Sequence, residues 1–92
     1  MKRYNDADLV LARMIELLRL GGGDGWATAL KNIKMDLRID PEHALSQLLS
    51  LYGGMGSLND VVLYRDGQSL VAENMEFDTL RSQLYELCQK IK

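Results

Sequence analysis

The run Tyr52–Asp60 constrains the fold of this chain more than any other segment. It places three glycines in four positions, and it separates a leucine-rich helical pattern from a strand-like pattern. Glycine has no Cβ, so it can adopt positive φ angles and can let two backbones approach closely. We therefore expect a helix to end here and extended structure to begin.

Apolar residues at helical spacing predict two helices in the first forty residues. The first is expected to begin near Asp6, with Asn5 or Asp6 as its cap, and to end at Gly21-Gly22-Gly23. Asp24 is expected to cap the second helix. That helix should end before Asp40-Pro41, because a residue that precedes proline disfavours the helical conformation.

A third helix is predicted directly after this break. Asp40 supplies a cap, Pro41 suits the first helical position, and Glu42 places an acid in the first turn. Gly53 is expected to close the helix in the left-handed conformation. Its predicted apolar face comprises Ala44, Leu45, Leu48, Leu49 and Tyr52.

A β-hairpin is predicted between residues 61 and 72. The β-rich runs Val61–Tyr64 and Ser69–Ala72 flank Arg65–Gln68, which contains the turn pair Asp66-Gly67. A two-residue loop would pair Leu63 with Leu70 and Val61 with Ala72, and Val62 and Val71 would share the other face.

A final helix is predicted to begin at Asn74 or Asp78 and to run close to the end of the chain. Its apolar seam is too short for a stable coiled coil, so we expect it to pack on the other helices. The seam comprises Phe77, Leu80, Leu84, Leu87 and Ile91. The expected fold is a single α+β domain over residues 1–92, mostly helical, in the order α-α-α-β-β-α.

Composition narrows the class of protein. The net charge of −2 gives no general argument for nucleic acid or an anionic membrane, and no apolar run approaches the roughly 20 residues that span a bilayer. Residues Met1–Asp6 lack the apolar segment of a signal peptide. The single cysteine, Cys88, cannot form an intramolecular disulfide, so we expect a cytoplasmic protein without membrane contact.

Catalytic and cofactor motifs are weak in this sequence. His43 and Cys88 are the only residues of their types and lie far apart, so an exposed histidine and a half-buried cysteine are favoured over a catalytic pair. Asp36, Asp40 and Glu42 could hold a hard cation, but Asp40 is better explained as a helix cap. The glycine run reverses the strand–loop–helix order of phosphate loops. We expect neither an enzyme nor a cofactor.

Charge is distributed unevenly along the chain. Residues 60–78 contain five acids and one base, Arg65, so the hairpin end should be acidic and could dock into a cationic cleft. Charge that only keeps the hairpin soluble is the alternative. Lys31, Lys34 and Arg38 align on one helix face, which suggests a solvated surface or, less readily, a nucleic-acid patch.

The runs Tyr52–Asp60 and Val62–Tyr64 resemble a stretch shared by a group of small uncharacterised bacterial proteins. The later run Glu73–Arg81 also looks like theirs, and the resemblance covers mainly Leu48–Cys88. The group offers no catalytic residue to transfer. Small single-domain bacterial proteins of this kind are often immunity proteins, which bind and block a toxin, and that analogy shapes the functional expectation.

We therefore expect a non-enzymatic binding protein whose partner is a bacterial toxin domain. A small protein that homodimerises through its last helix is the first alternative, and a nucleic-acid-binding regulator is the second. The residues expected to bind the partner are Gly54, Met55, Ser57, Asn59, Asp60, Asp66, Glu73 and Glu76.

Overall fold

The computed structural model describes residues 2–53 and 57–91, and within them it contains four α-helices and one two-stranded hairpin. This confirms the predicted α+β fold and its element order. The elements are α1 (Lys2–Leu20), α2 (Asp24–Ile39), α3 (Pro41–Ser50), the 3₁₀ turn η1 (Leu58–Asp60), β1 (Tyr64–Arg65), β2 (Gln68–Ser69) and α4 (Val71–Ile91).

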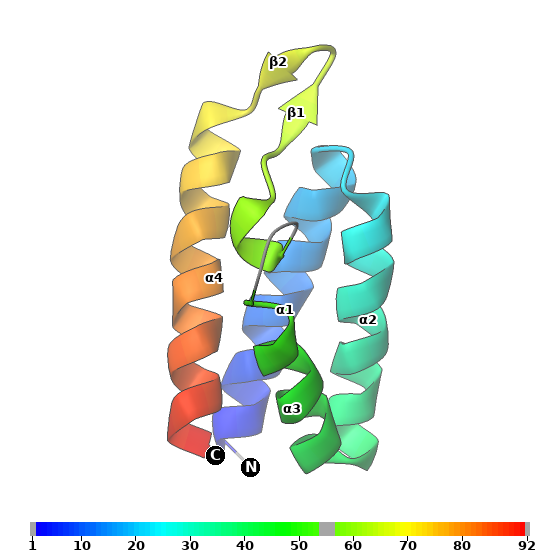
Figure 1. Ribbon diagram of the computed structural model, residues 1–92, viewed down its shortest axis with the longest axis vertical. Coiled ribbons are helices and arrows are strands. Elements are labelled where there is room, and N and C mark those ends of the chain that lie inside the picture. Colours follow the sequence, from blue (N-terminus) through cyan, green and yellow to red (C-terminus); the bar gives the residue numbers. More distant parts are fainter. Residues whose placement is uncertain (1, 54–56, 92) are drawn as a thin grey trace.

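The helices form a bundle in which α1 lies between α2 and α4. Helix α1 contacts both α2 and α4 along its length, and α3 packs mainly on α2 (Figure 1). The segment that carries η1 fills the space beside α4 above α3, and the hairpin projects at the end where α4 begins (Figure 1). None of the helices in the described ranges is long and apolar enough to cross a membrane.

One hydrophobic core joins all four helices, η1 and the segment before the hairpin. Its largest fully buried members are Phe77, Leu11, Met14, Leu17, Leu18, Leu30, Leu48, Leu58, Leu63, Leu84 and Cys88. Helix α1 is buried on more than one side, because it packs against both α2 and α4. The seam of α4 also packs inside the molecule: Phe77 and Leu84 are fully buried, and Leu80 and Leu87 are partly buried against the core.

The helix signals around Asp40 act as predicted. The Asp40 carboxylate accepts a hydrogen bond from the backbone N–H of His43 at 3.3 Å, and Pro41 occupies the first position of α3. The prediction for Gly53 was wrong. In the described residues, the glycines with positive φ are Gly22, which follows α1, and Gly67 in the hairpin turn.

Two predicted helix starts were also wrong. Helix α1 begins at Lys2, before the polar residues expected to cap it, and α4 begins at Val71, ahead of both Asn74 and Asp78. The expected cap of α2 was wrong as well: Asp24 is the first residue of this helix, and the cap position is Gly23, which has no side chain to accept a hydrogen bond. Asp24 lies in the first turn of α2, where its negative charge is favourable.

The hairpin turn follows the prediction, but the strands are shorter. Asp66 and Gly67 have φ angles of 54° and 77°, typical of a type I′ turn, and the register pairs Arg65 with Gln68 and Tyr64 with Ser69. The Leu70 N–H donates to the Leu63 carbonyl at 3.0 Å, so the expected alignment of these two residues is present.

The predicted pairing of Val61 with Ala72 does not form, because α4 has already begun at Val71. Val71 and Ala72 therefore belong to a helix, and Val61 and Val62 lie outside the strands. A β-hairpin of this length is not stable alone and depends on the contacts at its base.

Gly21, which follows α1, contacts the residues at the base of the hairpin. The Gly21 carbonyl accepts a hydrogen bond from the Tyr64 N–H at 3.1 Å. A Cβ atom at Gly21 would lie 2.6 Å from the Cβ of Leu63 and 3.1 Å from its Cα. Glycine is required here by close packing, because a side chain would displace Leu63 from the core.

Candidate functional site

The beginning of the Tyr52–Asp60 run packs directly against α4. The Tyr52 hydroxyl donates to the backbone carbonyl of Arg81 at 2.7 Å, and the ring meets Tyr85 edge-to-face with centroids 5.1 Å apart. Burial raises the pKa of the Tyr52 phenol well above its ordinary value. Tyr52 therefore joins the end of α3 to the middle of α4 and stays protonated.

Arg81 fastens the other end of the same run to α4. Its Nη1 donates to the carbonyl of Asn59 at 3.1 Å and lies 3.4 Å from that of Leu58, while Nη2 pairs with Asp78 at 2.7 Å. The side chain is only 17% exposed. The sequence analysis missed this role, and the only local signal for it was Asp78 three residues earlier on the same helix.

The polar residues of the run also bond to one another. The Asn59 side-chain amide donates to the Tyr52 carbonyl at 2.9 Å, and the Asn59 N–H donates to the Ser57 hydroxyl at 3.3 Å. Ser57 is buried at 6% exposure and caps η1, whereas Asp60 is exposed. Gly54 and Met55, which were also predicted to bind a partner, lie outside the described residues.

An open groove of about 630 Å³ runs between the end of α3, η1 and α4. It brings together two segments that lie far apart in the chain, because Tyr52 and Asn59 come from the Tyr52–Asp60 run and Arg81 comes from α4. Its lining comprises Leu49, Tyr52, Gly53, Asn59, Arg81, Ser82, Tyr85 and Glu86.

The predicted acidic surface is partly neutralised in the structure. Glu76 forms a bidentate ion pair with Arg13 of α1, with distances of 2.6 Å from Nε and 3.0 Å from Nη2. The hydrogen bond from Arg13 lowers the pKa of the Glu76 carboxyl. Glu73 is half-buried, while Asp66 is exposed at the hairpin tip. No local pattern in the sequence indicates that α1 supplies a counter-charge here.

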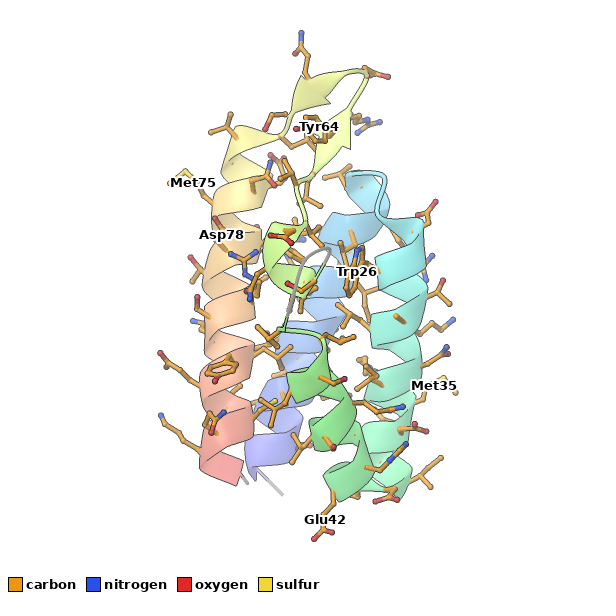
Figure 2. All side chains as sticks on the ribbon, in the orientation of Figure 1. Trp26, Met35, Glu42, Tyr64, Met75 and Asp78 are labelled. Atoms are coloured by element: carbon orange, nitrogen blue, oxygen red, sulfur yellow. The ribbon has the colours of Figure 1, made fainter. Side chains whose placement is uncertain are left out.

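The outward side of α4 carries exposed apolar side chains. Val71 and Met75 are each 67% exposed and Tyr85 is 42% exposed. With Asp78 and Ser82 they form what we call the α4 stripe, because residues at these spacings share one side of a helix. In Figure 2, Met75 points away from the helical bundle. The sequence analysis followed the buried seam of this helix and did not single out the stripe.

The hairpin adds exposed apolar side chains at the end of the molecule where α4 begins. Tyr64 is 53% exposed and Val62 is 49% exposed. Figure 2 shows Tyr64 and Met75 at this end, on the hairpin and on the first turns of α4 respectively. The hairpin end therefore combines apolar side chains with the carboxylate of Asp66.

The remaining candidate groups are dispersed. Cys88 is fully buried, which raises the pKa of its thiol to about 11, while His43 is exposed at the start of α3. Lys34 and Arg38 lie 3.3 Å and 3.9 Å from the Asp8 carboxylate of α1. No cluster of three metal-ligating side chains occurs in residues 2–53 and 57–91.

Comparisons with known proteins identify a family but no function. A search of curated proteins and a search of solved structures each gave no match. The model of the family described as domain of unknown function DUF6966 matches residues 19–71, from the end of α1 through α2, α3, η1 and the hairpin to the first residue of α4. This match covers the Tyr52–Asp60 run and more than half of the chain. The chain therefore belongs to the DUF6966 family.

Proposed function

We propose that this domain is a non-enzymatic protein-binding module and that it serves as a bacterial immunity protein that binds and neutralises a toxin. The α4 stripe is the observation that carries the proposal. Val71 and Met75 are each 67% exposed and Tyr85 is 42% exposed along one side of α4. Apolar surface of this kind marks sites of association when it is grouped and bordered by polar groups.

The stripe and the hairpin have the composition of a protein interface. Methionine and tyrosine are enriched at interfaces, where they fill pockets in the partner. Met75 and Tyr64 are both more than half exposed, and neither is needed to fill the core. Contact with a partner would remove their apolar surface from water.

Charge indicates the kind of partner. Asp66 is exposed at the hairpin tip, and the Asp78 side chain is 63% exposed within the stripe. Asp78 is already paired with Arg81 at 2.7 Å, so a partner with a basic surface would meet complementary charge chiefly at Asp66, which speeds association and favours the correct partner. Toxins that act on nucleic acids carry such basic surfaces, because their substrate is anionic.

The position of Cys88 argues against a catalytic role for its thiol. The Cys88 thiol lies in the core, and its raised pKa of about 11 keeps it protonated at neutral pH.

The self-associating alternative rested on the seam of the last helix. Phe77 and Leu84 of that seam are fully buried within the chain, so a dimer would have to use other residues.

Growth protection tests this proposal. The tagged protein is purified from the organism that encodes it, and a co-purifying toxin domain is then expressed in a sensitive host with and without this protein. We expect the toxin alone to arrest growth and co-expression to restore it. Failure to restore growth would contradict the immunity function. Sedimentation that shows a stable oligomer and no other protein would favour the self-associating alternative.

A further inference from the structure

The groove between α3, η1 and α4 has an aromatic wall beside a carboxylate. Tyr85 projects from α4 at 42% exposure and is held in place by its edge-to-face contact with Tyr52. Tyr52 is itself fixed through its hydroxyl to the Arg81 carbonyl. Glu86, the next residue on α4, lines the same groove and is exposed. The aromatic surface is therefore ordered before any ligand arrives.

The positive charge of Arg81 is already engaged within the molecule. The guanidinium of Arg81 is paired with Asp78, donates to the Asn59 carbonyl and is largely covered. It is therefore not available to an anionic ligand. No ion pair joins Glu86 to another residue of the described ranges. A cation that enters the groove would meet the carboxylate of Glu86 and the ring of Tyr85, which both line it.

We infer that this groove binds an arginine side chain supplied by the protein partner. A guanidinium is planar, stacks on aromatic rings and forms bidentate pairs with carboxylates, so it can contact Tyr85 and Glu86 together. A lysine ammonium has no planar face for such stacking. This inference rests on the proposed function for its source of arginine.

The groove is continuous with the proposed partner-binding face. Ser82 and Tyr85 belong both to the α4 stripe and to the lining of the groove. A partner that covers Met75 and Val71 would extend along α4 towards Tyr85. An arginine on the surface of the partner would then be placed to enter the groove. The stripe would supply the apolar contacts, and Glu86 in the groove would supply the charged contact.

A titration with a small probe tests the groove without the partner. ¹⁵N-labelled protein is titrated with N-acetyl-arginine amide and, separately, with the neutral isostere N-acetyl-citrulline amide, and backbone amide shifts are followed by NMR. We expect saturable shifts at Tyr52, Tyr85 and Glu86 with the arginine probe, and none with the citrulline probe. Equal shifts with both probes, or no saturable shift, would overturn the inference.

Charge-neutral variants locate the contact. Glu86→Gln should weaken binding of the arginine probe at least about fivefold, because it removes the carboxylate partner. Glu42→Gln is the matched control, since Glu42 is exposed on the first turn of α3 and is shown in Figure 2 away from the groove. Equal affinity in the two variants would contradict the role of Glu86. The spectrum of each variant shows whether it is folded.

The titration and the growth assay can fail separately. Arginine binding without toxin neutralisation would support the inference about the groove and contradict the immunity function. Toxin neutralisation without arginine binding would support the immunity function and overturn the inference that the groove binds arginine.

Discussion

The side-chain amide of Asn74 pairs with both backbone groups of Leu63. Its Oδ1 accepts from the Leu63 nitrogen at 2.8 Å, and its Nδ2 donates to the Leu63 carbonyl at 3.1 Å and to the Leu70 carbonyl at 2.9 Å. One side chain on the first turn of α4 thus acts as a strand partner for a fully buried residue. Its Oδ1 supplies the acceptor for the Leu63 N–H, whereas the Leu63 carbonyl also accepts from the Leu70 N–H.

Replacing Asn74 should therefore destabilise the protein. Asn74→Ala leaves the backbone N–H of buried Leu63 without an acceptor, and we expect a loss of about 1–3 kcal/mol in the free energy of unfolding. Urea denaturation measures this. Ser69→Ala is the control, because it removes only the exposed contact between the Ser69 hydroxyl and Asn74 at 3.2 Å. Equal losses in the two variants would show that the pairing with Leu63 contributes little.

Two glycines of the first half should respond in opposite ways to alanine. A Cβ at Gly21 would meet Leu63 at 2.6 Å, so Gly21→Ala should cost about 1–3 kcal/mol through overpacking. Gly25 lies in α2 with nothing within 4 Å of an added Cβ, so Gly25→Ala should be neutral or stabilising by up to about 1 kcal/mol. Thermal unfolding of both variants measures the difference. A stable Gly21→Ala variant would contradict the tight contact.

The ion pair between Arg13 and Glu76 should make stability depend on pH. Hydrogen bonding to Arg13 lowers the Glu76 pKa below the ordinary value of 4.5, so the pair stabilises the fold above that value. This contribution is lost as the pH falls through the lowered pKa of the folded state. We expect the melting temperatures of the wild type and Glu76→Gln to differ at neutral pH and to converge in acid.

A double variant serves as the control for this pH effect. In Arg13→Gln/Glu76→Gln, neutral amides stand at both positions, so its melting temperature should stay parallel to that of Glu76→Gln across the range. A gap between the wild type and Glu76→Gln that did not change with pH would contradict an electrostatic role for the pair.

The Cys88 thiol should be unreactive in the folded protein. Burial raises its pKa to about 11 and blocks access, so at about pH 8 only roughly a thousandth of the thiol would be thiolate. We expect slow labelling by a thiol reagent in buffer and rapid labelling in denaturing urea. Rapid labelling of the folded protein would place Cys88 at an accessible site and reopen a catalytic role.

The sequence predicted those features of the fold that depend on a few adjacent residues. The helix break at Asp40-Pro41 and the turn at Asp66-Gly67 depend on the conformational preferences of a few adjacent residues, and both are present. The start of α4 was predicted too late. Asn74 looked like a helix cap, but its side chain binds Leu63, eleven residues earlier in the chain. Such a long-range role leaves no periodic signal.

The candidate site was predictable only in part. The importance of the Tyr52–Asp60 run was inferred from its glycines, yet the contacts that order it come from Arg81 and Tyr85 on α4. Pairing of Glu76 with Arg13 depends on how α1 and α4 pack, which no local pattern specifies. The α4 stripe follows from helical periodicity, and reading the side opposite the seam would have found it.

The most direct test of the account is whether the α4 stripe binds the partner. Met75→Lys places a positive charge in the stripe, and Met35→Lys makes the same change at a methionine of α2 that is 58% exposed. Each tagged variant is used for affinity purification from the native organism, and the recovered toxin domain is quantified by mass spectrometry. We predict that Met35→Lys recovers as much of the toxin domain as the wild type does. Met75→Lys should recover at least about tenfold less. Equal recovery by the two variants would contradict the assignment of this face.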